Sequence, residues 1–169
     1  MDEVGQEQVG LFDVEGRPAG TAPRARVRRE NLLHAATAVL VRDGTGRVYV
    51  HRRTTTKDVY PGLHDYVAGG VLQAGEDPTE GAVRELEEEL GVSGVPLSPL
   101  GASLYEDEHT RYWAHRFEAV WHGPVRWQPS EVDWGTWMTP DELRAHLADP
   151  AWPFVPDTRA VMGPVLRTL

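Results

Sequence analysis

The hydrophobic pattern changes between a period of two and a period near four along the chain, and this change separates predicted strands from predicted helices. Short apolar or alternating runs bounded by Gly and Asp turns are typical of strands. We expect strands at residues 34–41, 47–51, 96–104, 110–121 and 133–138, and a small hairpin within residues 9–21. The turn Asp43-Gly44-Thr45-Gly46 makes residues 47–51 the return strand of residues 34–41.

The period near four is clearest between residues 78 and 90. One side of this segment is an apolar stripe of Ala82, Val83, Leu86 and Leu90, and the opposite side is acidic. Asp77 suits an N-cap, Pro78 suits the first helical position, and Gly91 provides a stop. The sequence therefore predicts a helix over about residues 78–90.

Three other segments have weaker helical signals. Residues 139–148 open with capping residues and predict a helix, and residues 158–169 predict another that is interrupted at Gly163-Pro164. Basic residues 23–30 predict a short helix or arm whose arginines are typical of a solvated face. The order of elements predicts an α/β protein with a mixed sheet and helices packed on its faces.

Two connecting segments carry informative glycines and prolines. Residues 54–63 contain Tyr60-Pro61-Gly62 and predict an ordered loop. Residues 66–72 are apolar but are interrupted by Gly69-Gly70. Paired glycines in such a run indicate a bend where the backbone closely approaches another group.

Chain length and composition limit the class of protein. A chain of 169 residues, 40% of them hydrophobic, is long enough for one domain with its own core. We expect a single domain over residues 1–169, with the hairpin and arm at about 8–31 as its N-terminal part. No apolar run approaches the roughly 18 residues of a membrane span. The first ten residues are acidic and lack the apolar run of a secretion signal, so we expect a cytoplasmic protein without membrane contact.

Cysteine content and charge exclude further classes. The chain has no cysteine, which excludes disulfides, thiolate metal ligands and a cysteine nucleophile. Acidic residues outnumber basic ones by 26 to 17, for a net charge of −9. Contacts to a nucleic-acid backbone require Lys and Arg, so we expect no nucleic-acid partner. A small polyanionic substrate is consistent with this charge if divalent cations mediate its binding.

Three glutamates on the predicted helix form the strongest candidate site. Glu85, Glu88 and Glu89 are spaced by three and four residues, which places them on one face of the helix. Like charges so placed repel one another, and a divalent cation that prefers carboxylate oxygen, Mg²⁺ or Mn²⁺, offsets the repulsion. The alternative is a solvated acidic face on which Arg84 relieves part of the charge. Solubility alone does not explain the flanking glycines or the acid several residues earlier.

Residues 70–92 resemble the Nudix box, Gly-x5-Glu-x7-Arg-Glu-U-x-Glu-Glu-x-Gly-U with U apolar, at every specified position. In that family the box is a loop–helix–loop within an α/β/α sandwich, so the resemblance implies a Nudix fold with a mixed β-sheet. It also implies a Mg²⁺-dependent hydrolase that cleaves a phosphoanhydride bond in a small-molecule diphosphate, in particular a nucleoside diphosphate derivative.

The resemblance also implies roles for individual residues. The metal-binding and water-activating carboxylates of the box correspond to Glu85, Glu88 and Glu89. Arg84 corresponds to the residue that orients these carboxylates, Glu76 to a supporting acid, and Gly70 to a residue whose carbonyl oxygen is a metal ligand.

A looser resemblance extends over most of the chain, to the Nudix branch that includes isopentenyl diphosphate isomerase. It is carried by residues 11–16, 33–35, 52–62 and 151–154. The isomerase needs a Cys near residues 68–71, and its metal-binding His falls here at Val71. Its later acidic pair falls near residues 110–112. Because the box is complete in this chain and degraded in isomerases, hydrolysis is favoured over isomerisation. A Nudix-fold sensor that binds a nucleotide without turnover is a third hypothesis.

Four residues outside the box are candidates for substrate binding. Arg52, Arg53 and Lys57 suit a non-transferred phosphate, since the arginine fork matches phosphate geometry, and ordinary surface charge is the alternative. His34 is a candidate phosphate contact or relic metal ligand, although a structural, hydrogen-bonded role is favoured for a lone His on a strand.

Two larger sets of residues have open roles. Some aromatic residues either stack on a base or pack in the core: Trp113, Trp127, Trp152 and Phe154. A further metal ligand is sought among Glu106, Asp107, Glu108 and Glu118. The aromatic-rich later half of the chain is also a candidate surface for a homodimer.

Overall fold

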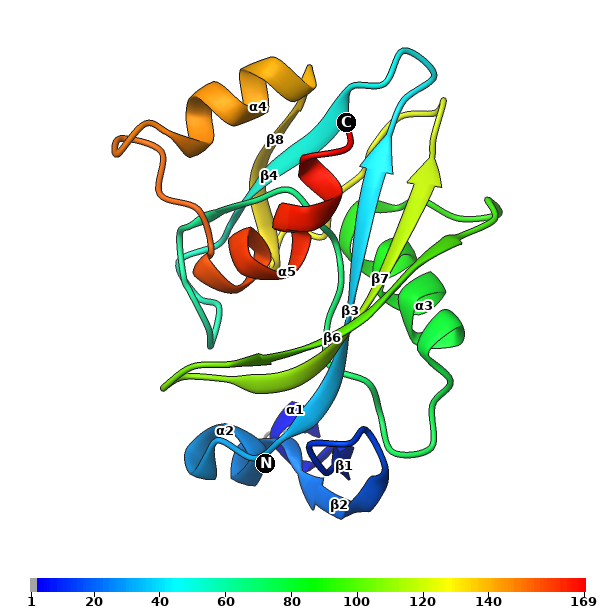
Figure 1. The fold of residues 1–169 in the computed structure, drawn as a ribbon, viewed down its shortest axis with the longest axis vertical. Helices are drawn as coiled ribbons and strands as arrows, with labels where there is room; N and C mark the ends of the chain where they lie inside the picture. The colour runs from blue at the N-terminus through cyan, green and yellow to red at the C-terminus, as the bar shows by residue number, and fades with distance from the viewer. Residues whose placement is uncertain (1–2) are drawn as a thin grey trace.

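The computed structural model describes residues 3–169, so Asp2, part of the acidic N-terminal segment, lies outside the described residues. Within these described residues, eight strands and five helices follow one another, and Figure 1 shows their arrangement. The first elements are α1 (Glu3–Gln6), β1 (Gln8–Phe12), β2 (Pro18–Pro23), α2 (Arg24–Glu30), β3 (His34–Arg42), β4 (Val48–Arg53) and β5 (His64–Asp65). They are followed by α3 (Pro78–Leu90), β6 (Ser98–Glu106), β7 (Arg111–Val120), β8 (Val132–Met138), α4 (Pro140–Leu147) and α5 (Pro156–Leu166).

The main sheet is mixed, as the sequence predicted, but one strand pairing differs from the expectation. Its order is β5-β4-β3-β7-β6, and β8 pairs with β4. β3 and β7 are parallel from His34↔Tyr112 to Arg42↔Val120. β3 and β4 pair only at Arg42↔Val48. The predicted strand after the turn is present, but its predicted pairing with β3 is wrong beyond the turn. β4 instead pairs antiparallel with β8 along most of its length.

Residues 68–72 occupy the edge of β3 from which β4 diverges. Val39 and Ala68 exchange two backbone hydrogen bonds of 2.7 and 2.9 Å, and the Thr37 amide donates to the Gly70 carbonyl at 3.0 Å. A Cβ atom added to Gly69 would lie 1.9 Å from the carbonyl oxygen of Thr37. The close backbone approach predicted from the paired glycines is confirmed.

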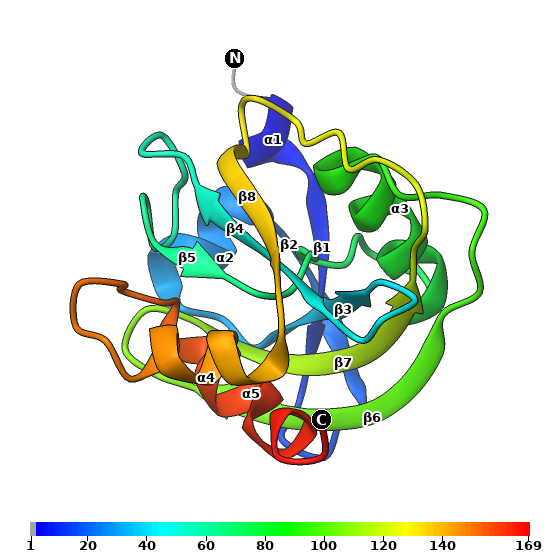
Figure 2. The ribbon, with the colours of Figure 1, turned by 90° about the horizontal axis from the view of Figure 1, so that it is seen from above.

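The two faces of the sheet bury two separate hydrophobic cores. Odd-numbered residues of β3, such as Val39, pack with Leu86 of α3 and Phe117 of β7. Even-numbered residues such as Leu40 pack with elements that include α4 and α5. The sheet therefore lies between α3 on one side and α4 and α5 on the other (Figures 1 and 2). This is the predicted α/β/α sandwich.

The predicted caps of α3 are present. The Asp77 side chain accepts from the amides of Thr79 and Glu80, and Gly91 ends the helix in the left-handed region with φ 65°. The predicted apolar stripe is wrong at one position, because Val83 is 42% exposed, whereas Ala82, Leu86 and Leu90 are buried. Glu89, three residues after Leu86, is buried on the same face as Ala82, Leu86 and Leu90, so this face is not purely apolar.

The C-terminal helix α5 starts earlier than predicted and is not interrupted at Gly163-Pro164. A proline inside a helix removes one backbone hydrogen bond. Here the loss falls near the helix end, and the buried Val161 and Met162 hold the preceding turn in the core. Arg144 of α4 then donates to the carbonyls of Leu166 and Leu169 at 3.0 and 2.7 Å, which satisfies backbone groups at the end of the chain.

The N-terminal hairpin and α2 pack against the start of the box. β1 pairs with β2, as the predicted hairpin requires, and Val9 also forms a bridge with Gln73. The Phe12 amide donates to the Leu33 carbonyl at 3.1 Å. Within residues 3–169, none of the helices has the length and hydropathy needed to cross a bilayer.

Candidate active site

Arg84 lies at the centre of the charged residues of α3. Its Nε and Nη2 atoms donate to Glu76 at 2.8 and 2.9 Å. Its Nη1 atom donates to Glu85 at 2.8 Å and to Glu88 at 3.4 Å. Forked guanidinium groups hold carboxylates in fixed directions. Arg84 therefore fixes the position of Glu85 and connects the loop acid Glu76 to the helix.

Glu85 lies against the backbone of the loop that precedes the helix. A Cβ atom added to Gly70 would lie 2.6 Å from the Glu85 carboxyl carbon, so a side chain here would displace this carboxylate from its position. Burial raises the pKa of Glu85 to about 7, against the opposing effect of Arg84. The ionised carboxylate is thus incompletely compensated by the protein, which a bound cation would correct.

Glu89 is the most buried of the three box glutamates, with 6% of its surface exposed. Its Oε1 atom lies 3.1 Å from Nε2 of His51, on β4. Burial alone would raise the pKa of Glu89, but His51, Arg53 and Lys57 together lower it below the usual value. Glu89 is therefore a buried carboxylate that stays ionised because cationic and imidazole groups surround it.

A cavity of about 170 Å³ is lined by Glu85, Glu88 and Glu89 of α3 together with Gln128 and Glu131. Glu131 is not among the metal ligands predicted from the sequence. The loop that carries it is attached to the end of α3, because the amides of Arg126 and Gln128 donate to the carbonyls of Leu90 and Glu89 at 2.9 Å. No sequence pattern marks Glu131, since this attachment is made by backbone atoms.

The donor groups of this cavity suit a hard divalent cation, because its lining side chains are four carboxylates and the amide of Gln128, all oxygen donors. Among residues 3–169, however, no group of three acidic or imidazole side chains is already close enough to hold a metal ion. Arg84 contacts both Glu85 and Glu88, so these carboxylates are held by the guanidinium. The residues therefore fit a metal by the chemistry of their donors and by lining one cavity, but among residues 3–169 their carboxylates do not converge on one point as they stand.

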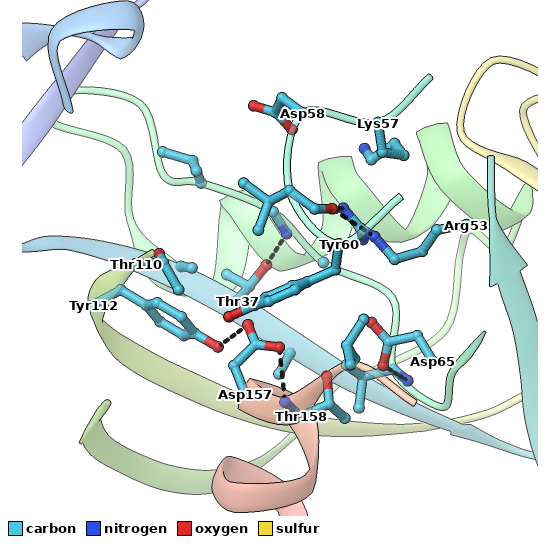
Figure 3. A pocket seen from close by; sticks show the side chains of 18 of the residues that line it. Thr37, Arg53, Lys57, Asp58, Tyr60, Asp65, Thr110, Tyr112, Asp157 and Thr158 are labelled. Atoms are coloured by element: carbon cyan, nitrogen blue, oxygen red, sulfur yellow. Dashed lines mark hydrogen bonds between the residues drawn. The ribbon is translucent and has the colours of Figure 1, made fainter. Parts of the chain in front are cut away.

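A second cavity adjoins the box and is lined by Arg53, Lys57 and His34 as well as by Gly70 and Glu89. Arg53 and Lys57 lie on one side of it, opposite Asp157 and Thr158 (Figure 3). The Arg53 guanidinium donates to the Val59 carbonyl at 3.1 and 2.8 Å, and the Lys57 ammonium pairs with Glu131. A more open cleft of about 750 Å³ continues from this cavity past Glu85 and Glu88, a volume that accommodates a nucleotide.

A family model described as the NUDIX domain matches residues 32–158. The chain belongs to the Nudix family. The uncharacterized Nudix hydrolase orf19 of Rhodococcus erythropolis is 47% identical over 167 residues, covering 93% of this chain and 90% of its own length. The uncharacterized Nudix hydrolase YfcD of Escherichia coli K12 is 42% identical over 152 residues, covering 90% of this chain and 82% of its own.

Among solved structures, DR0079 from Deinococcus radiodurans has the same fold, with a TM-score of 0.78 at 23% identity over 96% of this chain and 98% of its own. The family match and the two relatives, rather than this shared fold, identify the protein as a Nudix hydrolase, an enzyme of a family that acts on small molecules and generally uses divalent metal ions.

The four predicted substrate-binding residues of this Nudix hydrolase are not all brought together. Arg52 points away from the cavity and pairs with Asp133 at 2.7 Å, because neighbouring residues of a strand face opposite sides. His51 and Arg53 share the other side of β4, and the same alternation could have identified His51 from the sequence. His34 is 2% exposed, lines the cavity, and its Nδ1 lies 2.9 Å from the Leu32 carbonyl, as a structural role requires.

The other acidic and aromatic candidates lie apart from the box carboxylates. Glu106 pairs with Arg111, and Glu118 pairs with Arg42. Asp107 accepts from the hydroxyls of Tyr60 and Tyr105, and Glu108 is exposed.

The aromatic candidates pack within the protein or lie at its surface. Phe154 is buried in the core, and Trp152 packs on His64 with ring centroids 4.5 Å apart. Trp113 donates to the Asp13 carbonyl at 3.0 Å, and Trp127 is 36% exposed.

Asp65 of this Nudix hydrolase gives a prediction about stability and pH. It is 6% exposed, and burial raises its pKa to about 6 from a usual value of 3.8. The folded state then binds more protons than the unfolded state between these values, so stability falls as pH rises through this window. Asn does not titrate, so Asp65→Asn lacks this loss. We therefore expect the free energy of unfolding of Asp65→Asn, minus that of the natural protein, to increase by about 2 to 3 kcal/mol between pH 4 and pH 7.

Urea unfolding at the two pH values measures this change. Asn retains an oxygen that accepts from the Val67 amide, which donates to Asp65 at 3.2 Å. A difference between the two proteins that stays constant with pH would show that Asp65 is not the group responsible.

Proposed function

We propose that this Nudix hydrolase is a Mg²⁺-dependent enzyme, with Mn²⁺ as a substitute, that cleaves the phosphoanhydride bond of a small-molecule diphosphate, in particular a nucleoside diphosphate derivative. The observation that supports this most directly is the contiguity of two oppositely charged regions. The cleft that contains Glu85, Glu88 and Glu131 is also lined by Lys57 and Arg24. Carboxylates suit the cation and basic side chains suit phosphate, so one molecule can engage both.

Each residue then has a proposed part in the reaction. Glu85, Glu88, Glu89 and Glu131 would hold Mg²⁺, with the Gly70 carbonyl as a further oxygen donor. A cation held there would supply charge neutralisation for the phosphate oxygens and would lower the pKa of a water molecule. Arg84 orients Glu85, and the environment of His51, Arg53 and Lys57 keeps Glu89 ionised at neutral pH.

Arg53 and Lys57 are proposed to bind the non-transferred phosphate. Both line the cavity that reaches Glu89, whereas Arg52 lies on the opposite side of β4. His34 contributes to the wall of this cavity, with its ring held by the Leu32 carbonyl. We also propose that residues 1–169 form one domain that includes the hairpin and arm at 8–31, supported by the Val9↔Gln73 bridge to the box loop.

A phosphate-release screen tests the proposed function. We expect the purified protein with Mg²⁺ to release phosphate or nucleotide from at least one member of a panel of nucleoside di- and triphosphates, sugar nucleotides, dinucleotides and isoprenyl diphosphates. EDTA should abolish the release, and added Mg²⁺ should restore it. A metal-saturated protein that stays inactive across the panel would contradict the proposal.

Two other outcomes of the same screen would identify the alternatives. Rearrangement of an isoprenyl diphosphate without phosphate release would indicate isomerase-like chemistry, the activity of the branch to which the chain shows a looser resemblance. Tight binding of an intact nucleotide, measured by titration calorimetry without turnover, would indicate a sensor. The molar mass in solution, measured by light scattering, tests the candidate homodimer.

A further inference from the structure

Helix α2 lies before the matched NUDIX domain, which begins at residue 32, yet it supplies part of the wall of the catalytic cleft. Arg24 and Arg28 are four residues apart and so share one side of the helix. Both line the cavity that contains Glu89 and the adjoining cleft that contains Glu85. The sequence predicted a solvated face for these arginines, and that expectation is wrong for this pair.

The side chains of Arg24 and Arg28 are mostly buried, with 20% and 24% of their surface exposed. Burial lowers the pKa of Arg28. The Nε atoms of both residues are buried, and neither has a hydrogen-bond partner among residues 3–169. Nε of Arg28 is 3.3 Å from Asp58, at ion-pair distance but outside hydrogen-bond geometry. Arg24 also donates through Nη1 to Glu7 at 3.4 Å, so one part of its guanidinium is paired. Buried guanidinium donors are normally paired, so the two Nε atoms have unused capacity for an acceptor.

A single carboxylate oxygen lies where the two guanidinium groups converge. Oδ2 of Asp58 is 3.3 Å from Nε of Arg28 and 3.8 Å from Nη2 of Arg24. Burial would raise the pKa of Asp58, but it is lowered overall by four nearby cations: Arg28, Arg24, Lys57 and Arg53. Asp58 therefore marks a position at which the protein binds negative charge, and it is 49% exposed, on a loop at the edge of the cleft.

We propose that Arg24 and Arg28 form an anion subsite for the unesterified terminal phosphate of the substrate, and that Asp58 occupies this subsite until the phosphate enters. The inference rests on the proposed function, because it assigns one end of a diphosphate to the arginines and the rest to the box. A terminal phosphate carries up to two negative charges and offers three free oxygens, which suits two guanidinium forks. The preferred substrates then end in a free phosphate and do not have both phosphates esterified.

Binding of inorganic pyrophosphate to the EDTA-treated protein tests the subsite without metal or turnover. Calorimetric titration at low salt should show that Arg24→Gln and Arg28→Gln each raise the Kd at least tenfold. Asp58→Asn should lower the Kd several-fold, because the competing carboxylate is removed. Arg26→Gln is the matched control, since Arg26 lies on the same helix but is 52% exposed and pairs with Glu30. Its Kd should stay that of the natural protein.

Three results would overturn the subsite: no measurable pyrophosphate binding by the natural protein, equal effects of Arg26→Gln and Arg28→Gln, or an unchanged or weaker affinity of Asp58→Asn. Circular dichroism of each variant verifies that it is folded. Because no hydrolysis is measured, a failure of the proposed function would leave these binding results as they are.

A matched pair of substrates tests the substrate class. ADP and ADP-ribose share the adenosine diphosphate unit and differ only in the ester on the terminal phosphate. With Mg²⁺ we expect kcat/KM to be at least tenfold higher for ADP, and Arg28→Gln to remove most of this preference through KM. A preference for ADP-ribose, or one that Arg28→Gln does not change, would overturn the assignment.

Discussion

We expect Glu89→Gln to lower kcat by roughly 10³-fold, within the range measured when a positioned charged group is removed from an active site. The substitution keeps the size of the side chain but removes the charge of a carboxylate that is 6% exposed and surrounded by His51, Arg53 and Lys57. The remaining box glutamates are more exposed and cannot replace a charge at this depth. Steady-state kinetics at saturating Mg²⁺, on a substrate from the phosphate-release screen, measure the effect.

Glu87→Gln is the matched control for this variant. Glu87 lies on the same helix, two residues earlier, but its side chain is exposed and does not line the cavity of the box glutamates. Its kcat should stay within about twofold of the natural value, as expected for a surface substitution remote from the site. Similar losses in the two variants would mean that the charge of the whole helix matters, and would remove the special role of Glu89.

We expect the largest loss of stability from Gly69→Ala, about 3 kcal/mol, the upper part of the usual range for overpacking. The added Cβ atom would lie 1.9 Å from the Thr37 carbonyl oxygen, a backbone atom that cannot rotate away. Residues 68–72 would have to move away from β3, which breaks hydrogen bonds such as the one from the Thr37 amide to Gly70. Thermal unfolding should show a Tm lower by roughly 6 to 12 °C.

Gly10→Ala is the control for an added methyl group. Gly10 lies in β1, and its added Cβ atom would be 3.5 Å from Phe12, an ordinary contact distance. The free energy of unfolding should change by no more than about 0.5 to 1 kcal/mol, since Ala costs less backbone entropy than Gly in a strand. If Gly69→Ala is as stable as Gly10→Ala, residues 68–72 are not held against β3 as the structure shows.

The local parts of the fold could be predicted from the sequence because they depend on neighbouring residues. The caps at Asp77 and Gly91, and the close approach at Gly69, each follow from one residue type in one place. The errors arise where tertiary contacts decide. Val48 continues a plausible hairpin, but β8, more than 80 residues later, is the better partner of β4. Pro164 stays in a helix because Val161 and Met162 are buried beside it.

The candidate site divides in the same way. The box residues could be found from their spacing. Residues three and four apart share one face of a helix, and a cation site needs its carboxylates on one face. Glu131 could not, since its loop is positioned by backbone hydrogen bonds to the end of α3. Arg24 and Arg28 carry a visible charge, but only the packing of α2 against the cleft distinguishes them from the exposed Arg26.

The separation of β3 and β4 after the single pair Arg42↔Val48 has a consequence for how such an enzyme can diverge. Main-chain atoms of residues 68–72 fill the edge of β3 there, so one wall of the binding cavity and the first box residue, Gly70, belong to one rigid stretch. An insertion in that stretch would move the box relative to β3, whereas side-chain changes in α2 and in the loop after β4 would not. Related enzymes with different substrates should therefore keep the length of the segment that corresponds to residues 68–72. Their differences should lie in the side chains of α2 and of the loop after β4.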